Sequence, residues 1–392
     1  MNRSIRRTVG GLGGALLGVV ISLAGTTEVA AAGSEGESRA AVPIATAATP
    51  VPKGFKANSI TWLSSELGWV LGTVPCGSKV CSEVIGTKDG AKTWSVVGAL
   101  KAPIPNTSLG GRGVTEIRFA TPEIGWAFGP DLYRTTDGGR TWAHEAIPGH
   151  GEQVLDLAAN ATEAYAVVSD CTHYCSKQFT FWRTTSLTKN EWAQISLSLP
   201  NAITADVTVY GQTVYLLDPY GQIRPHEDKL YASTDGLHFS TRPVPCDKNP
   251  LPAGLIQVVP SSATDVTLLC DGDAGLSEAD KYAYRSTNTG KTDRAAGTMG
   301  LPGIQAQLAV SPSGNVAVSS QSDGSFIYIN DNHKTSWTQV IGDSDGGVGW
   351  NDIVYVTDSE AWVVYAPAEG FLSQGQLWET TDGGRHWSVT TP

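Results

Sequence analysis

The sequence has no surplus of positive charge, and this absence limits the partners that it can attract. Of its 392 residues, 27 are Lys or Arg and 38 are Asp or Glu, so the formal net charge is −11. Nucleic acids and anionic membranes bind basic surfaces, and we expect neither as a partner. The sequence also lacks helical periodicity, a phosphate-binding loop and a dinucleotide-binding fingerprint, so it predicts no nucleotide site of these kinds.

No apolar run reaches the length of a membrane span, and residues 1–32 instead resemble an export signal. Three Arg residues precede an apolar stretch over residues 9–23, and the run Ala30-Ala31-Ala32 matches a small-residue cleavage pattern. Residues 33–54 are rich in Ala, Ser, Thr, Pro and Glu, which predicts a flexible linker. We expect a secreted protein, extracellular or associated with the cell envelope, without membrane insertion; general and twin-arginine export both stay open.

What the sequence does contain is a short turn that recurs seven times, about 49 residues apart. Its form is Ser/Thr-x-Asp-x-Gly-x-x-Trp, and we call it the Asp turn. The clearest copies are residues 135–142 and 380–387, and Ala91 replaces the second Gly in residues 87–94. Weaker copies lie at 185–192, 233–239, 286–293 and 330–337. A fixed period of this length indicates a repeat architecture.

Two apolar runs precede each Asp turn and fix the type of repeat. An example is Ile117-Arg118-Phe119 followed by Gly125-Trp126-Ala127-Phe128. Short β-branched and aromatic runs between Gly, Asp, Ser and Pro turns predict strands. Each unit therefore has four strands, A to D in chain order, with the Asp turn between C and D. Seven such units predict an all-β fold, a seven-bladed β-propeller over residues 55–392 with strand D of the last blade at the C-terminus.

The Asp side chain of the turn can accept hydrogen bonds from turn amides, while Gly supplies positive φ at little cost. A catalytic site does not need seven copies of one carboxylate. We therefore interpret Asp89, Asp137, Asp235 and Asp382 as structural residues.

These turns and the blade over residues 125–142 resemble the Asp-box (BNR) repeat. The match is best with photosystem II assembly-factor-like propellers, and more distant with sialidases, xyloglucan hydrolases and sortilin-type receptors. The resemblance covers about residues 55–392 and implies the fold without implying one function, because these families share the repeat and not the activity. The early Arg-Ile-Pro signature of sialidases is absent, and most Arg residues fall in strand C or the Asp turn, so we expect no sialidase activity.

The six cysteines form an even set in a chain that we expect to be exported. Matching loop positions in two blades predict the disulfides Cys76–Cys81 and Cys171–Cys175, and elimination leaves Cys246–Cys270. Cys171 and Cys175 enclose a His and could instead bind a metal, but no second Cys/His pair lies nearby in the sequence.

Strand A lines the centre of a propeller, and its polar residues are the candidates for a site. Alignment at the apolar anchors puts one set of residues at a common level. This level holds Ser59, Glu116, Val154, Asp206, Leu255, Gln307 and Asp352. Two residues further on come Thr61, Arg118, Asp156, Thr208, Gln257, Ala309 and Val354. The candidate ligand-binding residues are Glu116, Arg118, Asp156, Asp206 and Asp352; the alternative is a polar, water-filled channel.

Two acidic loops leave calcium open as a cofactor. Asp271 and Asp273 alternate as oxygen ligands would, and Asp343 and Asp345 form a shorter version. Neither completes an EF-hand loop, so we otherwise expect no cofactor.

Together these features predict a non-catalytic, monomeric binding or assembly module that engages a protein or a cell-surface glycan. The B–C and D–A loops share the face opposite the Asp turns, and variable loops on a rigid scaffold are where binding usually occurs. No catalytic residue is indicated. The alternative is a glycoside hydrolase with two carboxylates about 5–9 Å apart at the channel mouth. We expect Asp206 and Asp352 to serve binding and to contribute nothing to stability.

Overall fold

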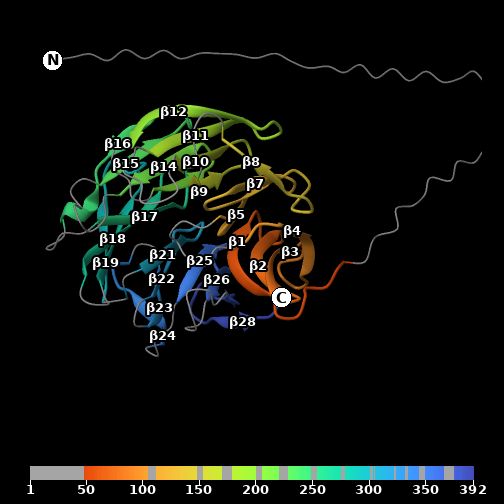
Figure 1. Cartoon of the computed structure of the whole chain (residues 1–392). Helices are drawn as coiled ribbons and strands as arrows, with labels where there is room; N and C mark the ends of the chain where they lie inside the picture. The colour runs from red at the N-terminus through yellow and green to blue at the C-terminus, as the bar shows by residue number, and fades with distance from the viewer. Residues whose placement is uncertain are drawn as a thin grey trace, which may run out of the picture. The chain divides into compact units, whose positions relative to one another are not determined.

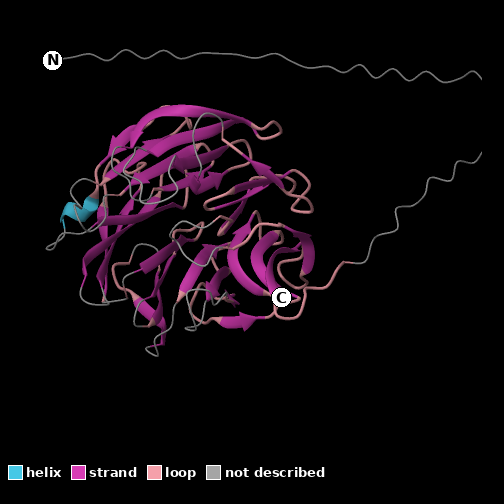
Figure 2. Cartoon of the chain, viewed as in Figure 1, coloured by secondary structure: helices cyan, strands magenta, loops and turns pink. Residues whose placement is uncertain are grey.

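Seven four-stranded antiparallel sheets make up the protein and stand around a common axis as the blades of a propeller (Figure 1). The computed structural model describes residues 48–104, 112–147, 153–169, 179–199, 205–219, 228–248, 254–274, 279–300, 303, 305–321, 324–331, 334–343, 349–365 and 375–392. Within these residues the only helix is a short 3-10 turn over Pro245–Lys248, and the rest is strand and loop (Figure 2). No helix in the described part of the chain is long and apolar enough to cross a membrane.

Each blade consists of four consecutive strands, A to D. Blades 1 and 2 contain β1 (Lys56–Trp62), β2 (Gly68–Cys76), β3 (Lys79–Thr87), β4 (Ser95–Ala99), β5 (Glu116–Phe119), β6 (Gly125–Phe128), β7 (Leu132–Thr135) and β8 (Ala143–Glu145). Blades 3 and 4 contain β9 (Gln153–Ala159), β10 (Ala164–Ser169), β11 (Phe179–Ser186), β12 (Glu191–Leu199), β13 (Asp206–Tyr210), β14 (Thr213–Asp218), β15 (Lys229–Ser233) and β16 (Ser240–Arg242). Blades 5 to 7 contain β17 (Gly254–Pro260), β18 (Val266–Ala274), β19 (Ala279–Ser286), β20 (Arg294–Met299), β21 (Gln305–Val310), β22 (Val316–Gln321), β23 (Ser325–Asn330), β24 (Thr338–Asp343), β25 (Trp350–Tyr355), β26 (Ala361–Tyr365), β27 (Gln376–Thr380) and β28 (Ser388–Thr390).

The predicted seven-bladed fold is confirmed, with strand D of the last blade at the C-terminus. Strand A is innermost in every blade, because the A strands of successive blades contact one another in an unbroken circuit from β1 to β25 and back. The ring closes without a strand shared between blades 1 and 7. Ala57 and Gly375 exchange two backbone hydrogen bonds of 2.9 and 2.7 Å, and Trp62 stacks on Trp362 with ring centroids 5.2 Å apart.

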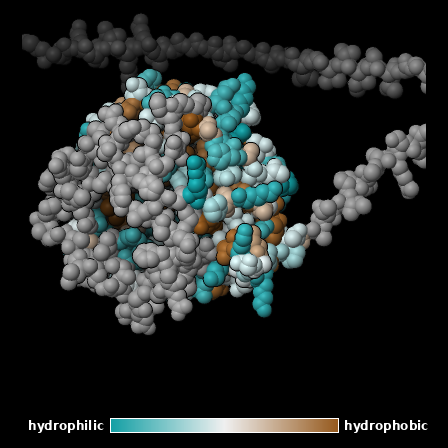
Figure 3. Space-filling view, in the orientation of Figure 1, coloured by the Kyte–Doolittle hydropathy of each residue, from teal (hydrophilic) through white to brown (hydrophobic). Residues whose placement is uncertain are grey.

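The core consists of the apolar side chains that neighbouring blades press together. Trp69 of blade 1, for example, stacks on Phe119 of blade 2 at 3.8 Å between ring centroids. On the outside of the described part, the exposed large apolar side chains are few and separate: Leu63, Val80, Tyr210, Leu237 and Val389. Figure 3 shows hydrophilic and apolar residues interspersed where the described surface is visible.

The compact unit also includes residues that precede β1. Thr49 and Pro50 lie along the outer edge of β4, where the Val96 amide donates to the Thr49 carbonyl at 2.9 Å and Pro50 pairs with Ser95. These residues therefore add a short extended segment to the outside of blade 1.

The Asp turn is held by a compact set of hydrogen bonds, shown clearly in blade 2. Asp137 Oδ1 accepts from the Thr141 amide at 2.9 Å and from Thr135 Oγ1 at 2.8 Å, and Oδ2 accepts from Thr141 Oγ1 at 2.6 Å. Thr135 Oγ1 in turn accepts from the Gly139 amide at 2.9 Å. Gly139 has φ of 95°, a conformation that favours glycine.

Asp89, Asp137, Asp235 and Asp382 all lie between strands C and D of their blades, as predicted. In blades 1, 2 and 7 the residue after the Asp donates its amide to the A–B turn of the same blade. The Asp turns and the A–B turns therefore share one face of the propeller, and the B–C and D–A connections share the other.

Blade 3 has lost its Asp turn and replaces one of its contacts with a side chain from blade 2. In blade 2, the Trp142 indole donates to the carbonyl of Gly139 in its own turn at 2.9 Å. Blade 3 has no glycine at that place, and its Trp192 indole donates to Glu145 Oε1 at 2.5 Å. Glu145 is almost completely buried, and burial raises its pKa.

Two of the three predicted disulfides are confirmed. Cys76 bonds Cys81 at the end of the β2–β3 hairpin, and Cys246 bonds Cys270, which fastens the connection between blades 4 and 5 to β18. Cys171 and Cys175 lie outside the described residues, so their pairing stays a prediction.

We expect Asp137→Ala to lower the free energy of unfolding by about 1–2 kcal/mol, because the Thr141 and Thr135 donors lose their acceptor. Urea denaturation of the purified protein measures this loss. Thr136→Ala is the matched control, since Thr136 is an exposed residue of the same turn, and it should leave the unfolding midpoint unchanged. Equal stability of Asp137→Ala and wild type would mean that the turn does not depend on its carboxylate.

Candidate binding site at the axial ring

Seven side chains on the A strands stand at one level around the axis. Each pairs with the equivalent residue of its own strand B, which fixes the level independently of any sequence alignment. We call these residues the axial ring: Ser59, Glu116, Asp156, Asp206, Gln257, Gln307 and Asp352. All seven are polar, and four of them carry carboxyl groups.

The predicted level is wrong in blades 3 and 5. There we expected Val154 and Leu255, but these side chains are buried between the sheets. The pairing shifts by one residue between Val154 and Asp156, and again between Leu255 and Gln257. Such an extra residue is a β-bulge, and it reverses the alternation of side chains between the two faces of the strand. Two residues on either side of the bulge therefore point to opposite faces. Asp156 pairs with Val167, as Glu116 pairs with the equivalent Phe128, so the two acidic residues share one level.

Five of the ring side chains connect their blade to the next through a backbone amide. Asp352 Oδ2 of blade 7 accepts from the Ile60 amide of blade 1 at 3.0 Å, and Asp156 Oδ2 of blade 3 accepts from the Val207 amide of blade 4 at 2.6 Å. These carboxylates satisfy inner-strand donors that face a neighbouring blade. They are structural acceptors, whatever else they do.

Three further ring residues make the same kind of contact. Ser59 Oγ accepts from the Ile117 amide at 3.2 Å, and Gln257 Oε1 accepts from the Leu308 amide at 2.5 Å. Asp206 accepts a hydrogen bond from the Val258 backbone.

The expectation that Asp352 contributes nothing to stability is therefore wrong. Its Oδ2 atom also accepts from Ser59 Oγ at 2.9 Å. Alanine at this position would leave two partly buried donors, the Ile60 amide and the Ser59 hydroxyl, without their acceptor, at a cost of about 1–3 kcal/mol.

Arg118 supplies positive charge next to the ring. It lies two residues after Glu116 on the same strand face, and its guanidinium contacts Glu116 Oε2 at 2.8 Å and Asp352 Oδ2 at 3.5 Å. The side chains of Glu116 and Arg118 keep 36% and 30% of their surface exposed, and because β5 is an inner strand this surface faces the axis. The structure thus brings Glu116, Arg118 and Asp352 into one cluster, with Asp156 and Asp206 near enough to act on its charges.

Four carboxyl groups and one guanidinium leave the ring short of positive charge, and the protonation of the ring reflects this. Although part of the Glu116 side chain is exposed toward the axis, desolvation among the surrounding inner strands, followed by the charges of Asp156 and Asp352, raises its pKa to about 7 despite the nearby Arg118. Burial and the charge of Glu116 raise the pKa of Asp206 to about 6, although Asp156 and Arg118 oppose the shift. Burial also raises the pKa of Asp156, whose carboxyl group hydrogen-bonds that of Asp206. The negative charge of Asp206 adds to this shift in the pKa of Asp156.

The Asp271 side of the proposed calcium site already holds a cation from the protein. Lys281 Nζ donates to Asp271 Oδ1 at 2.7 Å and to the Ala279 and Gly303 carbonyls at 3.0 and 2.6 Å, in a fully buried position. The sequence signal that we missed is Lys281 itself, which alternates with Ala279 and Ala283 on a buried strand face. The side chains of Asp273 and Asp343, and the whole of Asp345, lie outside the described residues.

Comparison with known proteins identifies the fold and no family. No protein-family model matches the chain, and no curated protein matches it. The chain is similar to the oligogalacturonate lyase of Vibrio parahaemolyticus, with 9% identity and a TM-score of 0.55 over 85% of this chain and 92% of that one. It is also similar to Sqt1 of Saccharomyces cerevisiae, with 9% identity and a TM-score of 0.51 over 85% and 84% of the two chains.

A third similar structure is YCF48 from Cyanidioschyzon merolae, with 14% identity and a TM-score of 0.48 over 74% of this chain and 87% of that one. At these identities the likeness shows the fold alone, because propellers host unrelated functions.

We expect Glu116→Gln to reduce the loss of stability between pH 5 and pH 8. The pKa of Glu116 rises from 4.5 to about 7 on folding, so its contribution to stability is complete below pH 4.5 and is lost as the pH rises through 7. Glutamine stays neutral throughout, so the melting temperature of the variant should fall less over this range than that of wild type. Thermal unfolding followed by circular dichroism measures both.

The control for this experiment is Glu123→Gln. Glu123 is exposed on the face of the Asp turns, so the melting temperature of this variant should depend on pH as that of wild type does. Parallel curves for Glu116→Gln and wild type would show that Glu116 does not titrate in this range.

Proposed function

We propose that the protein is a secreted, non-catalytic binding module that engages a basic group of a protein partner at the axis, on the face of the B–C and D–A loops. The observation that carries this proposal is the charge imbalance of the axial ring. Glu116 and Asp206 begin strands that follow D–A connections, so the acidic centre is close to that face. Burial and like charges together raise the pKa of Glu116 and Asp206, and a Lys or Arg side chain would offset the like charges.

The surroundings of the ring support a polar mode of recognition. Exposed large apolar side chains in the described part of the molecule are scattered over several blades, whereas a hydrophobic docking surface is contiguous. Charged groups that face a partner mainly set specificity and the rate of association. An uncharged glycan would not use the charge imbalance, so we favour a protein ligand over a cell-surface glycan.

Export and the monomeric state belong to the same proposal. The two disulfides support an oxidising compartment, as do the signal-like residues 1–32 and the linker-like composition up to residue 54. Neither calcium nor another cofactor is required for the binding that we propose.

A glycoside hydrolase remains the second candidate, and one observation favours it. A carboxyl group with a pKa of about 7, as burial gives Glu116, suits a general acid. Against it, Asp156 and Asp206 hydrogen-bond each other, whereas a hydrolase holds its two carboxyl groups about 5–9 Å apart. We expect no release of chromophore from a panel of nitrophenyl glycosides; turnover that Glu116→Gln abolishes would favour the hydrolase instead.

The binding proposal predicts that peptides selected from a random display library on the mature protein include a class that depends on Lys or Arg. Glu116→Gln should weaken these peptides at least tenfold, about 1.4 kcal/mol, because it removes a negative charge that faces the axis. Fluorescence anisotropy measures the affinities. Glu123→Gln, an acidic-to-neutral change on the opposite face, is the matched control and should bind as wild type does.

Two results would contradict this proposal. One is a set of selected peptides without any dependence on basic residues. The other is equal affinity of basic peptides for Glu116→Gln and wild type. Binding to a neutral glycan in place of peptides would favour the glycan ligand.

A further inference from the structure

The chain itself shows how an extended segment can bind to the outside of a blade. Thr49 and Pro50 lie antiparallel to β4, the outermost strand of blade 1, with the Val96 amide bonded to the Thr49 carbonyl at 2.9 Å. The next residue, Val51, packs in the apolar cluster that includes Trp94 and Val96. Blade 1 thus binds three residues of extended chain through one backbone contact and one apolar side chain.

The outer edge of blade 2 has the same register. In blade 1, Gly86 pairs with Ser95 and Ile85 with Val96; in blade 2, Arg134 pairs with Ala143 and Tyr133 with His144. His144 therefore takes the place of Val96, and Trp142 takes the place of Trp94. The Val96 amide donates outward from blade 1, and the His144 amide is its counterpart in blade 2.

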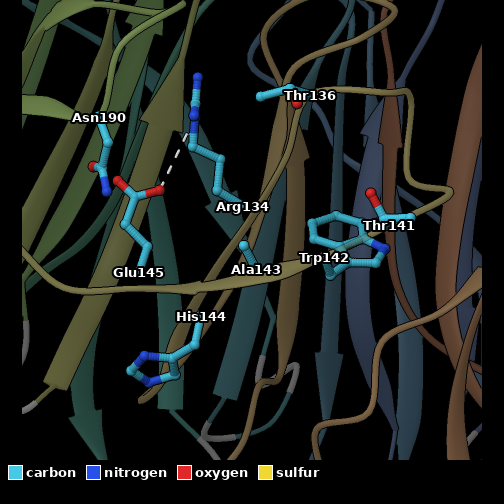
Figure 4. Close-up of a pocket in the computed structure, with 8 residues that line it drawn as sticks. All are labelled: Arg134, Thr136, Thr141, Trp142, Ala143, His144, Glu145 and Asn190. Carbon is cyan, nitrogen blue, oxygen red and sulfur yellow. Dashed lines mark ion pairs between the residues drawn. The ribbon is translucent and has the colours of Figure 1, made fainter.

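The edge of β8 is open in the described part of the chain. β8 is the last strand of its sheet and pairs with β7 alone among the described strands. Ala143 and His144 are exposed. A pocket of about 230 Å³ runs along this edge, between the strand, the Asp turn of blade 2 and Asn190 of blade 3 (Figure 4).

We infer that the edge of β8 is a docking site for an extended segment of a partner protein, which adds to blade 2 as an antiparallel strand. This site lies on the perimeter of the propeller and is independent of the function proposed for the axial ring. Strand addition supplies affinity through backbone hydrogen bonds, and side chains at alternate positions supply specificity.

The walls of the site define the segment that fits. Trp142 is half-buried, with its indole N–H already bonded to Gly139, so its ring offers an apolar surface beside His144. This is the place that Val51 occupies in blade 1, and it suits an aliphatic side chain.

The pocket side is polar. Arg134 and Glu145 face each other at 4.0 Å and balance their charges, and the exposed Asn190 lies beside them (Figure 4). A small uncharged polar side chain, such as Ser, Thr or Asn, fits there better than a charged one. The partner segment therefore alternates a small polar residue with an aliphatic residue, and β8 is so short that its binding is weak.

The test uses decapeptides selected from a random display library on the intact mature protein, and it compares two variants of one residue. His144→Pro removes the outward amide while Pro is tolerated on an edge strand, and His144→Ala keeps that amide. We expect a class of peptides whose affinity falls at least tenfold with His144→Pro and less than threefold with His144→Ala. The axial variant Glu116→Gln should bind this class as wild type does, which separates the two sites.

A second measurement does not depend on how His144→Pro folds. In the wild-type protein, a bound peptide of this class should slow hydrogen exchange of the His144 amide and leave the Val96 amide, already bonded to Thr49, unchanged.

Absence of any peptide that protects the His144 amide would overturn the inference. So would equal binding to the Pro and Ala variants, or selected peptides without the aliphatic position. A self-association that sedimentation detects and His144→Pro abolishes would also overturn it, because a second copy of the chain would then be the occupant.

Discussion

The contact on which this propeller depends is the hydrogen bond from an inner-strand amide of one blade to a ring side chain of the preceding blade. Strand A has strand B on one edge only, so its other edge must find partners at the axis. Asp352, Ser59, Asp156 and Gln257 each accept such an amide directly. The seam between blades 7 and 1 thus uses the same kind of hydrogen bond as the seams between blades 1 and 2, 3 and 4, and 5 and 6.

The need for hydrogen-bond acceptors at the axis explains why the ring is polar in every blade. It also explains the unfavourable electrostatic interactions within the ring. Carboxylates are good acceptors for amides, but four of them around one axis repel one another, and only Arg118 opposes them. Burial, together with this repulsion, raises the pKa values of Glu116, Asp156 and Asp206. The Asp turns behave in the opposite way, because turn donors lower the pKa of Asp89 and lower that of Asp382 to about 2.

The two groups of carboxylates therefore give the free energy of unfolding opposite pH dependences: one group loses its contribution at low pH and the other at higher pH. The turn carboxylates stabilise the fold above their unfolded pKa of 3.8, and this contribution is lost as the pH falls through their folded values. Glu116 and Asp206 stabilise the fold when protonated, and this contribution is lost as the pH rises through about 6 to 7. A binding partner with a basic side chain would reduce only the second loss of stability, the one that occurs as the pH rises.

The sequence contains enough to predict the blades, because the Asp turn and the apolar runs are local patterns that repeat. It does not contain enough to predict the axial level in blades 3 and 5, because the apolar residues there also fit an alignment two residues earlier. The β-bulge ahead of the level, which blades 1, 3, 5 and 7 share, alters only the pairing and leaves the composition of the strand unchanged. Asp156 was among the candidates, but at the wrong level. The roles of Glu145 and Lys281 could not be predicted for a related reason, because each residue binds a group from another part of the fold. Glu145 accepts from the Trp192 indole, which has no turn carbonyl of its own, and Lys281 donates to the Gly303 carbonyl.

Blade 3 shows most directly how the repeat can decay without loss of the fold. Once the turn glycine is gone, the Trp192 indole needs another acceptor, and a carboxylate from blade 2 reaches across the seam to provide it. Arg134 of blade 2 and Trp192 of blade 3 both contact that carboxylate, and it lies on β8, which pairs with β7 alone among the described strands. The open edge of β8 and the eroded turn of blade 3 are therefore linked by one buried side chain, Glu145.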